Sequence, residues 1–208
     1  MSYATCFEKL PELETSRLLL RQITSSESDG KDCLEYINDY NVYRYWGLYD
    51  EANDPDGMHK PRTKKKVDYH YNYTLKEFNA GRELCWLMER KDTKKVIGEI
   101  VLYDFQLQKQ ADIGYRINSN HWGQGFAVEA GQAIVKAAFE EMALHRLQIR
   151  CFKVNTGSLR VAEKLCFAQE GFIKEGAILN VITDYYIFGY LHEDYKKAIT
   201  INSTTKSI

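Results

Sequence analysis

The 208-residue chain has few cysteines, and none of them stands in a spacing that binds a metal. The five cysteines are at positions 6, 33, 85, 151 and 166, with no CxxC pair and an odd total. Disulfide bonds and a structural zinc site are therefore not expected. The five histidines also lack an HExxH-type spacing, so we expect no bound metal. Free thiols of this kind are typical of a cytoplasmic protein.

The chain also lacks an excess of charge of either sign, and it lacks long apolar segments. Its 28 lysines and arginines against 29 aspartates and glutamates leave a net charge of −1, whereas a nucleic-acid-binding domain normally carries a strongly basic face. No apolar stretch approaches the roughly 20 residues that a membrane span needs. The first residues, MSYATCFEKLPELET, show no basic region followed by an apolar run, so no signal peptide is predicted. We expect a soluble protein with neither nucleic acid nor membrane as a partner.

What the sequence does contain is a mixed pattern of strands and helices without a linker or a repeat. Apolar patterning predicts strands over residues 16–24, 83–90, 95–105, 111–117, 147–152, 167–175 and 181–191. Helical spacing predicts one or two short helices over 31–46, and further helices over 67–79, 126–142 and 158–166. Residues 47–66 are typical of a mobile loop, and the polar tail 199–208 is expected to fray. We predict one α+β domain over 1–208, with its core at about 12–194.

The segment GYRINSNHWGQGFAVEAG (114–131) leads from a predicted strand through a glycine-containing loop into a helix. Small residues at Gly123, Gly125 and Ala127 would let a diphosphate approach the backbone closely. The N–H groups of the first helical turn, and the helix dipole, favour negative charge there. A dinucleotide fingerprint would need Gly or Ala where Val128 stands, and no Gly-Lys-Ser/Thr motif occurs. The structural alternative is a loop that only turns tightly into a helix.

The run ADIGYRINSNHWGQGFAVEA resembles the acetyl-coenzyme A-binding core of the GNAT superfamily, in particular its RimJ/RimL-like branch of N-acetyltransferases. The resemblance extends to LETSRLLLRQI, KKVIGEIVL, NTGSLRVAEKLCFAQEGF and TDYYIFGYL, and it covers roughly residues 12–191. It implies a GNAT fold, a twisted and mostly antiparallel sheet with helices on both faces. Strands 111–117 and 147–152 would run parallel and splay apart at the cofactor site.

The same resemblance implies how acetyl-coenzyme A would bind. Its pantetheine arm would pair with the exposed backbone of a strand, and an N–H of that strand would polarise the thioester carbonyl. Its diphosphate would rest on the glycine-containing loop, and Asn155 would contact the arm. The expected cofactor-binding residues are Ile113, Gly114, Tyr115, Trp122, Gly123, Gln124, Gly125, Phe126, Ala127, Asn155 and Ser158.

Two side chains are candidates for catalysis. Ser158 would stand near the sulfur, where a hydroxyl can protonate the departing thiolate; many GNAT enzymes use a tyrosine four residues later, where this chain has Ala162. The alternative for Ser158 is to cap the short helix. The sequence does not decide which residue is the general base. Glu99 and Asp112 lie on adjacent predicted strands, and we take Glu99 as the candidate. Glu129 is expected to hold the loop by a hydrogen bond.

These residues predict an acetyl-coenzyme A-dependent N-acetyltransferase. The acceptor would be a primary amine, either a protein N-terminus or a small molecule, and transfer would be direct within a ternary complex because no cysteine has a recognisable catalytic setting. The alternative is a catalytically silent GNAT-like domain that binds coenzyme A as a sensor or interaction module. Asn155 and Ser158 argue against that alternative. The sequence leaves open whether the protein forms a homodimer.

Overall fold

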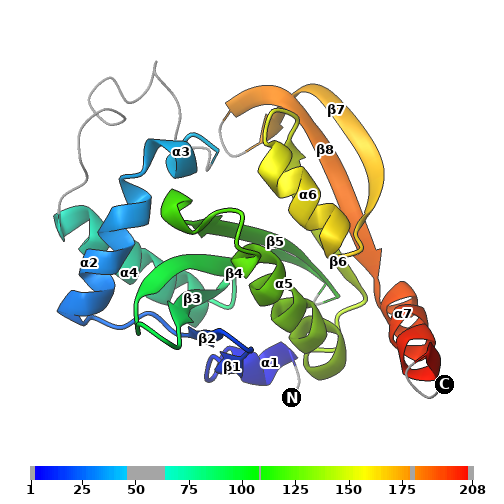
Figure 1. The fold of residues 1–208 in the computed structure, drawn as a ribbon, viewed down its shortest axis with the longest axis horizontal. Coiled ribbons are helices and arrows are strands. Elements are labelled where there is room, and N and C mark those ends of the chain that lie inside the picture. The colour runs from blue at the N-terminus through cyan, green and yellow to red at the C-terminus, as the bar shows by residue number, and fades with distance from the viewer. Residues whose placement is uncertain (1–2, 46–63, 108, 179–180, 206–208) are drawn as a thin grey trace.

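A computed structural model describes residues 3–45, 64–107, 109–178 and 181–205 of the chain (Figure 1). Its centre is an eight-stranded sheet in the order β1-β2-β3-β4-β5-β6-β8-β7. The strands are β1 Leu13–Glu14, β2 Leu18–Arg21, β3 Leu84–Arg90, β4 Val96–Gln106, β5 Gln110–Ile117, β6 Arg146–Phe152, β7 Ala168–Ile178 and β8 Val181–Leu191. The alternating apolar residues therefore form one continuous sheet, as the sequence predicts.

The middle of the sheet contains its one parallel pair, β5 and β6. The ladder between these strands joins only Gln110, Ala111 and Asp112 to residues 146–148. Beyond Asp112 the two strands diverge, while β5 stays paired with β4 along its whole length. The predicted splayed pair is confirmed, and the part of β5 after Asp112 has no ladder partner on its β6 side.

Helices cover both faces of the sheet (Figure 1). The α-helices are α1 Tyr3–Cys6, α2 Glu27–Ile37, α3 Tyr40–Tyr43, α4 Lys64–Asn79, α5 Phe126–Lys136, α6 Thr156–Lys164 and α7 His192–Thr205; a 3₁₀ turn lies at Ser119–His121 and a π-helical turn at Ala137–Glu141. Cys33 and Ile37 of α2 pack on Leu87 and Val96 at one face. The buried side of α5 packs into the larger core at the opposite face.

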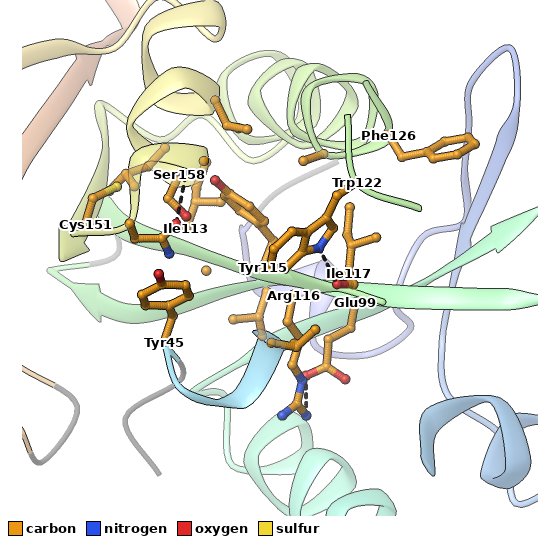
Figure 2. Close-up of a pocket in the computed structure, with 18 of the residues that line it drawn as sticks. Tyr45, Glu99, Ile113, Tyr115, Arg116, Ile117, Trp122, Phe126, Cys151 and Ser158 are labelled. Atoms are coloured by element: carbon orange, nitrogen blue, oxygen red, sulfur yellow. Dashed lines mark hydrogen bonds and ion pairs between the residues drawn. The ribbon is translucent and has the colours of Figure 1, made fainter. Parts of the chain in front are cut away.

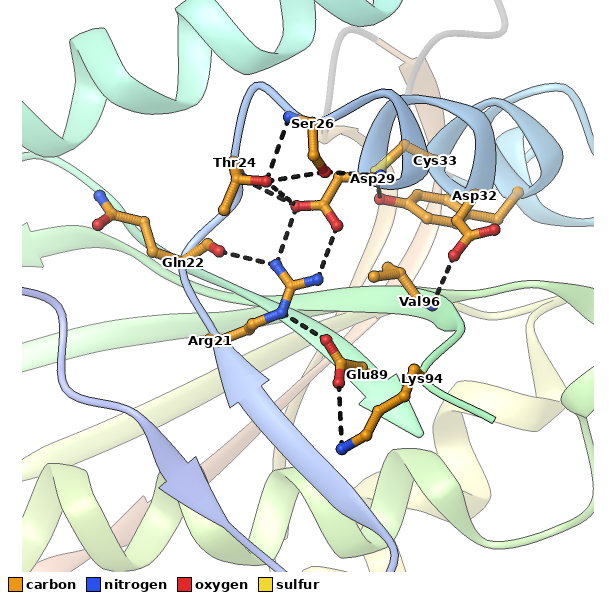
Figure 3. Close-up of polar contacts among 11 residues, drawn as sticks. Arg21, Gln22, Thr24, Ser26, Asp29, Asp32, Cys33, Glu89, Lys94 and Val96 are labelled. Carbon is orange, nitrogen blue, oxygen red and sulfur yellow. Dashed lines mark hydrogen bonds and ion pairs between the residues drawn. The ribbon is translucent and has the colours of Figure 1, made fainter. Parts of the chain in front are cut away.

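A polar cluster fixes the start of α2 on the sheet (Figure 3). The Arg21 guanidinium on β2 contacts Asp29 on α2 and Glu89 on β3, each at 2.6 Å. Thr24 also donates to Asp29, at 2.7 Å. Burial raises the pKa of Asp29, but the hydrogen bonds from Arg21 and Thr24 outweigh it and leave the pKa lowered. Because α2 is held at this end, its other residues have defined positions over β4.

Two boundaries differ from the sequence prediction. Helix α6 begins at Thr156 rather than near Ser158. The C-terminal segment is helical up to Thr205 rather than frayed from residue 199. In its first turn, Tyr195 packs on Phe139 and donates to Glu140 at 2.6 Å. Most of the predicted loop 47–66 lies outside the described residues. In the described part of the chain, no helix has the length and apolar character needed to cross a membrane.

Candidate active site

A large cavity, of about 1440 Å³, passes through the gap between β5 and β6 (Figure 2). One end is lined by the loop before α5 and by the start of α6. The other end reaches α3, α4 and the facing part of β4. Tyr115 and Arg116, consecutive on β5, both line it, although neighbouring residues of a strand point to opposite faces. The cavity therefore connects the two faces of the sheet.

The loop before α5 has the backbone of an anion site. Gly123 and Gly125 have φ angles of +74° and +83°, a conformation that side chains disfavour. Gly125 is the N-terminal cap of α5 and no side chain caps the helix, so its first N–H groups are available to a ligand. A Cβ atom added at Gly123 would meet no atom within 4 Å. Gly123 and Gly125 also line the cavity, so the loop has open space beside its backbone, as a bound diphosphate requires.

Arg17 and Glu129 hold this loop against the N-terminal segment. Glu129 accepts from Thr15 Oγ1 at 2.6 Å and from the Arg17 backbone N at 2.8 Å. The Arg17 side chain bonds Glu129 at 2.6 Å, donates to the Gln124 carbonyl at 2.9 Å and stacks on Phe126 at 4.3 Å. Burial alone raises the pKa of Glu129, but the hydrogen bonds from Thr15 and Arg17 outweigh burial and leave this pKa lowered. Glu129 thus fixes the loop as expected, with Arg17 as the intermediary.

The two loop aromatics have different roles. Phe126 is buried and belongs to the core. Trp122 is 47% exposed and lines the cavity, while its Nε1 donates to the Ile117 carbonyl at 2.7 Å. Gln124 forms part of the loop but does not line the cavity. The other expected cofactor-binding residues all do.

At the start of α6 the structure corrects the predicted cap. Asn155, not Ser158, is the N-terminal cap, and its Oδ1 accepts from the Ser158 backbone N at 3.1 Å. The Ser158 side chain lines the cavity beside Tyr115 (Figure 2). Burial raises the pKa of the Tyr115 phenol, and a loose polar contact with Ser158 opposes that rise. In the described part of the chain, the buried Tyr115 oxygen has no partner with normal hydrogen-bond geometry.

Cys151 also lines the cavity (Figure 2). Its side chain is buried, and burial raises the pKa of the thiol to about 12. A thiol is nucleophilic only as the thiolate. Cys151 is therefore protonated at neutral pH and acts as a small apolar wall residue.

Glu99 lies at the opposite end of the cavity, 2% exposed. Its Oε1 contacts Arg116 Nη2 at 2.8 Å, and its Oε2 lies 2.9 Å from both Tyr36 Oη and His70 Nε2. Burial alone raises the pKa of Glu99, but Arg116 and His70 outweigh it and hold the pKa well below its usual range. Glu99 is therefore ionised and its oxygens are already occupied by donors.

Asp112, the other carboxylate considered from the sequence, does not line the cavity. It is fully buried at the point where β5 and β6 are still paired. Arg150 Nε donates to it at 2.7 Å and Gln148 at 3.2 Å. Its role is therefore to join the two strands below the gap.

Sequence analysis missed three residues around Glu99. Arg116 stands opposite Glu99 in the β4–β5 register, a pairing that alignment of the two predicted strands could have found. Tyr36 and His70 come from α2 and α4, and no sequence spacing relates them to Glu99. In the described residues, His, Cys, Asp and Glu side chains do not gather into a group that could hold a metal ion.

A model of the acetyltransferase (GNAT) domain matches residues 17–168. The chain belongs to the GNAT family of acetyltransferases. It is 31% identical to the uncharacterised N-acetyltransferase YoaA of Bacillus subtilis over 166 residues, which are 79% of this chain and 87% of YoaA. A shorter match, 36% identical over 74 residues, links it to the ribosomal-protein-serine acetyltransferase of Escherichia coli, covering 36% of this chain and 41% of that protein.

Solved GNAT structures have the same fold. A GNAT acetyltransferase from Bacillus anthracis superposes with a TM-score of 0.72 at 26% identity, over 88% of this chain and 99% of that one. RimJ of Mycobacterium smegmatis, solved with a coenzyme A disulfide, superposes with a TM-score of 0.74 at 18% identity, over 88% of each chain. This GNAT chain is thus an acetyltransferase with RimJ/RimL-like relatives, and the family uses acetyl-coenzyme A.

Proposed function

We propose that this GNAT enzyme transfers the acetyl group of acetyl-coenzyme A directly to a primary amine within a ternary complex. One observation carries the proposal: a single cavity joins the amide-lined loop and Ser158 at one end to the Glu99 cluster at the other. A donor bound at the first end and an amine bound at the second would meet in the gap between β5 and β6. Holding both reactants in one cavity removes much of the entropic barrier to their reaction.

The residues at the first end fit acetyl-coenzyme A. The diphosphate would lie on Trp122–Ala127, where the helix N-terminus favours negative charge. Arg160 and Lys164 on α6 also line the cavity and would attract phosphate groups. The pantetheine arm would follow the unpaired edge of β5 at Ile113–Tyr115 and pass Asn155. A backbone N–H there would stabilise the oxyanion that forms on the thioester carbonyl.

Ser158 and Glu99 are the proposed chemical groups. Ser158 would donate a proton to the sulfur as the carbon–sulfur bond breaks, and Glu99 would provide the negative charge that favours removal of a proton from the amine. The protonated state of Cys151 supports direct transfer rather than an acetyl-enzyme, because a neutral thiol is a poor nucleophile. The amine must lose a proton before it can attack.

The acceptor is a protein N-terminus or a small amine. One relative is named for acetylating serine of a ribosomal protein, which makes a serine α-amine the first acceptor to try. Polyamines provide the contrasting small-molecule class.

The test is an acceptor screen with acetyl-coenzyme A. Purified protein is incubated with a peptide that has a free N-terminal serine, with the same peptide N-acetylated, and with spermidine, and release of coenzyme A thiol is recorded. We expect amine-dependent release with the free peptide or the polyamine, and background release with the blocked peptide. Thermal stabilisation by acetyl-coenzyme A without amine-dependent release would support the silent binding module instead.

A further inference from the structure

We propose that His70, rather than Glu99, takes the proton from the acceptor amine, and that Glu99 positions the imidazole. This inference rests on the proposed function, and it assigns the general base at the end of the cavity where the amine would bind. His70 lies on α4 and lines the cavity. Its side chain is 18% exposed, whereas that of Glu99 is 3% exposed. Of the two groups, the imidazole is the one that a substrate can reach.

Glu99 is poorly suited to accept the proton itself. Arg116 occupies one carboxylate oxygen at 2.8 Å, and Tyr36 and His70 both lie 2.9 Å from the other. An amine would have to displace one of these donors from a buried site. The same contacts stabilise the carboxylate and so weaken it as a base. Glu99 is instead arranged to orient a neighbour.

The contacts of His70 fix which ring nitrogen carries the proton. Nε2 lies 2.9 Å from a carboxylate oxygen of Glu99 and 3.3 Å from Arg116 Nη2. Because the ionised carboxylate can only accept and is the nearer of the two groups, we assign the hydrogen to Nε2, which donates it to Glu99. In the neutral ring the lone pair is then on Nδ1, for which no described residue provides a hydrogen-bond partner. A buried carboxylate that orients an imidazole in this way is a general device for preparing a base.

Charged and polar groups from several elements face His70. Glu99 on β4 attracts an imidazolium, and Arg116 on β5 repels it. Glu83, between α4 and β3, lies within electrostatic range of His70, and burial raises the pKa of this carboxyl. Tyr36 on α2 is fully buried and its pKa is raised by burial, so it remains a neutral donor. The imidazole thus lies between one carboxylate and one guanidinium.

The proposed reaction transfers the acetyl group from the sulfur of coenzyme A to the nitrogen of the amine. One ammonium proton moves to His70 Nδ1, and the freed nitrogen lone pair attacks the thioester carbonyl carbon. The carbon–sulfur bond then breaks and the sulfur leaves with the electron pair. The nitrogen gives up its second proton, which passes through the Ser158 hydroxyl to the departing sulfur, so that a neutral amide and the free thiol of coenzyme A are released. The imidazolium returns its proton to solvent through the open cavity.

The test compares His70→Gln with wild type across pH, using the serine peptide and spermidine. At pH 7 the variant should lose about 10²- to 10⁴-fold in kcat/KM, the usual effect of general base catalysis, with an unchanged thermal shift by acetyl-coenzyme A. The defect should shrink above about pH 8 for the peptide α-amine and only near about pH 10 for an alkyl amine, where each loses its own proton. A purely structural role would not produce this dependence on the acceptor.

Two further variants complete the test. His145 is exposed and does not line the cavity, so His145→Gln should match wild type at every pH. His70→Ala should regain activity when imidazole is added, whereas the Gln variant should not. Wild-type activity in His70→Gln, or a defect constant across pH and not rescued by imidazole, would overturn the assignment. A wild-type enzyme inactive with every amine would instead contradict the proposed function.

Discussion

Asn155 performs the structural task at the start of α6 that Ser158 could otherwise have performed. Asn155 caps α6 and bonds the backbone of Ser158 rather than its hydroxyl. The Ser158 side chain is therefore not needed to begin the helix, and it lines the cavity beside Tyr115. From the sequence, proton donation to the sulfur and capping of the helix were both open roles for Ser158, because a serine side chain can accept a hydrogen bond from a helix N-terminus. Only the backbone geometry distinguishes them.

Replacing Ser158 separates catalysis from stability. Ser158→Ala should lower kcat by roughly 10²-fold, since a proton donor to the thiolate is lost, and should leave both the melting temperature and acetyl-coenzyme A affinity nearly unchanged. Asn155→Ala should instead cost about 1 kcal/mol of stability, as other lost caps do. Ser158→Thr, which keeps the hydroxyl, should retain most activity. Steady-state kinetics are the measurement. Full activity of Ser158→Ala would contradict this role and would indicate that water donates the proton.

At the scale of elements, the loop before α5 is held rigid from outside. Its conformation depends on left-handed glycines and on the Arg17–Glu129 contact. A rigid loop presents its amides without paying an ordering cost when the ligand binds. We therefore expect the loop to contribute affinity for the diphosphate, while other elements provide the chemistry.

Two glycines allow the loop to be tested against a matched control. Gly125 and Gly81 have similar φ angles, +83° and +70°, but Gly81 lies at the end of α4 and outside the cavity. Each glycine-to-alanine change should cost about 1 kcal/mol through the left-handed backbone. Only Gly125→Ala should weaken acetyl-coenzyme A binding, by about tenfold or more, because Gly125 lines the cavity, and a strained backbone with a new Cβ 3.5 Å from Arg17 Nη2 would shift the loop amides. Calorimetric titration that found equal affinity in both variants would exclude the loop from the site.

Elements with strong periodicity were predicted from the sequence, and elements defined by tertiary contacts were not. The helix beginning at Phe126 and strands β5 and β6 follow from amphipathic spacing and alternation. Helix α7 was missed because its last residues are polar and favour no helix, whereas packing of Tyr195 on Phe139 stabilises its first turn.

The residues of the candidate site also divide into those that the sequence predicts and those that depend on tertiary contacts. The cofactor loop and Ser158 lie in contiguous motifs, so the sequence alone could propose them. The side chains that contact Glu99 come from three separate elements, α2, α4 and β5. Their meeting depends on how those helices pack on the sheet, for which the sequence has no local pattern.

At the scale of the whole molecule, the divergence of β5 and β6 is the feature that organises function. It interrupts a sheet that is otherwise continuous and opens a passage between faces covered by different helices. Acetyl-coenzyme A and the amine would approach from opposite ends of that passage. The account therefore predicts that both substrates are bound when the acetyl group moves, with no covalent intermediate on the protein.

The most direct test is mass spectrometry of an early-quenched reaction containing the enzyme, acetyl-coenzyme A and the serine peptide or spermidine. The account predicts that the amine gains one acetyl group while the intact protein keeps its mass throughout turnover, and that omitting either substrate abolishes product. An acetylated protein that forms with acetyl-coenzyme A alone and then transfers its group to the amine would contradict direct transfer. Binding of acetyl-coenzyme A with no acetylated amine from any acceptor would contradict the catalytic function itself.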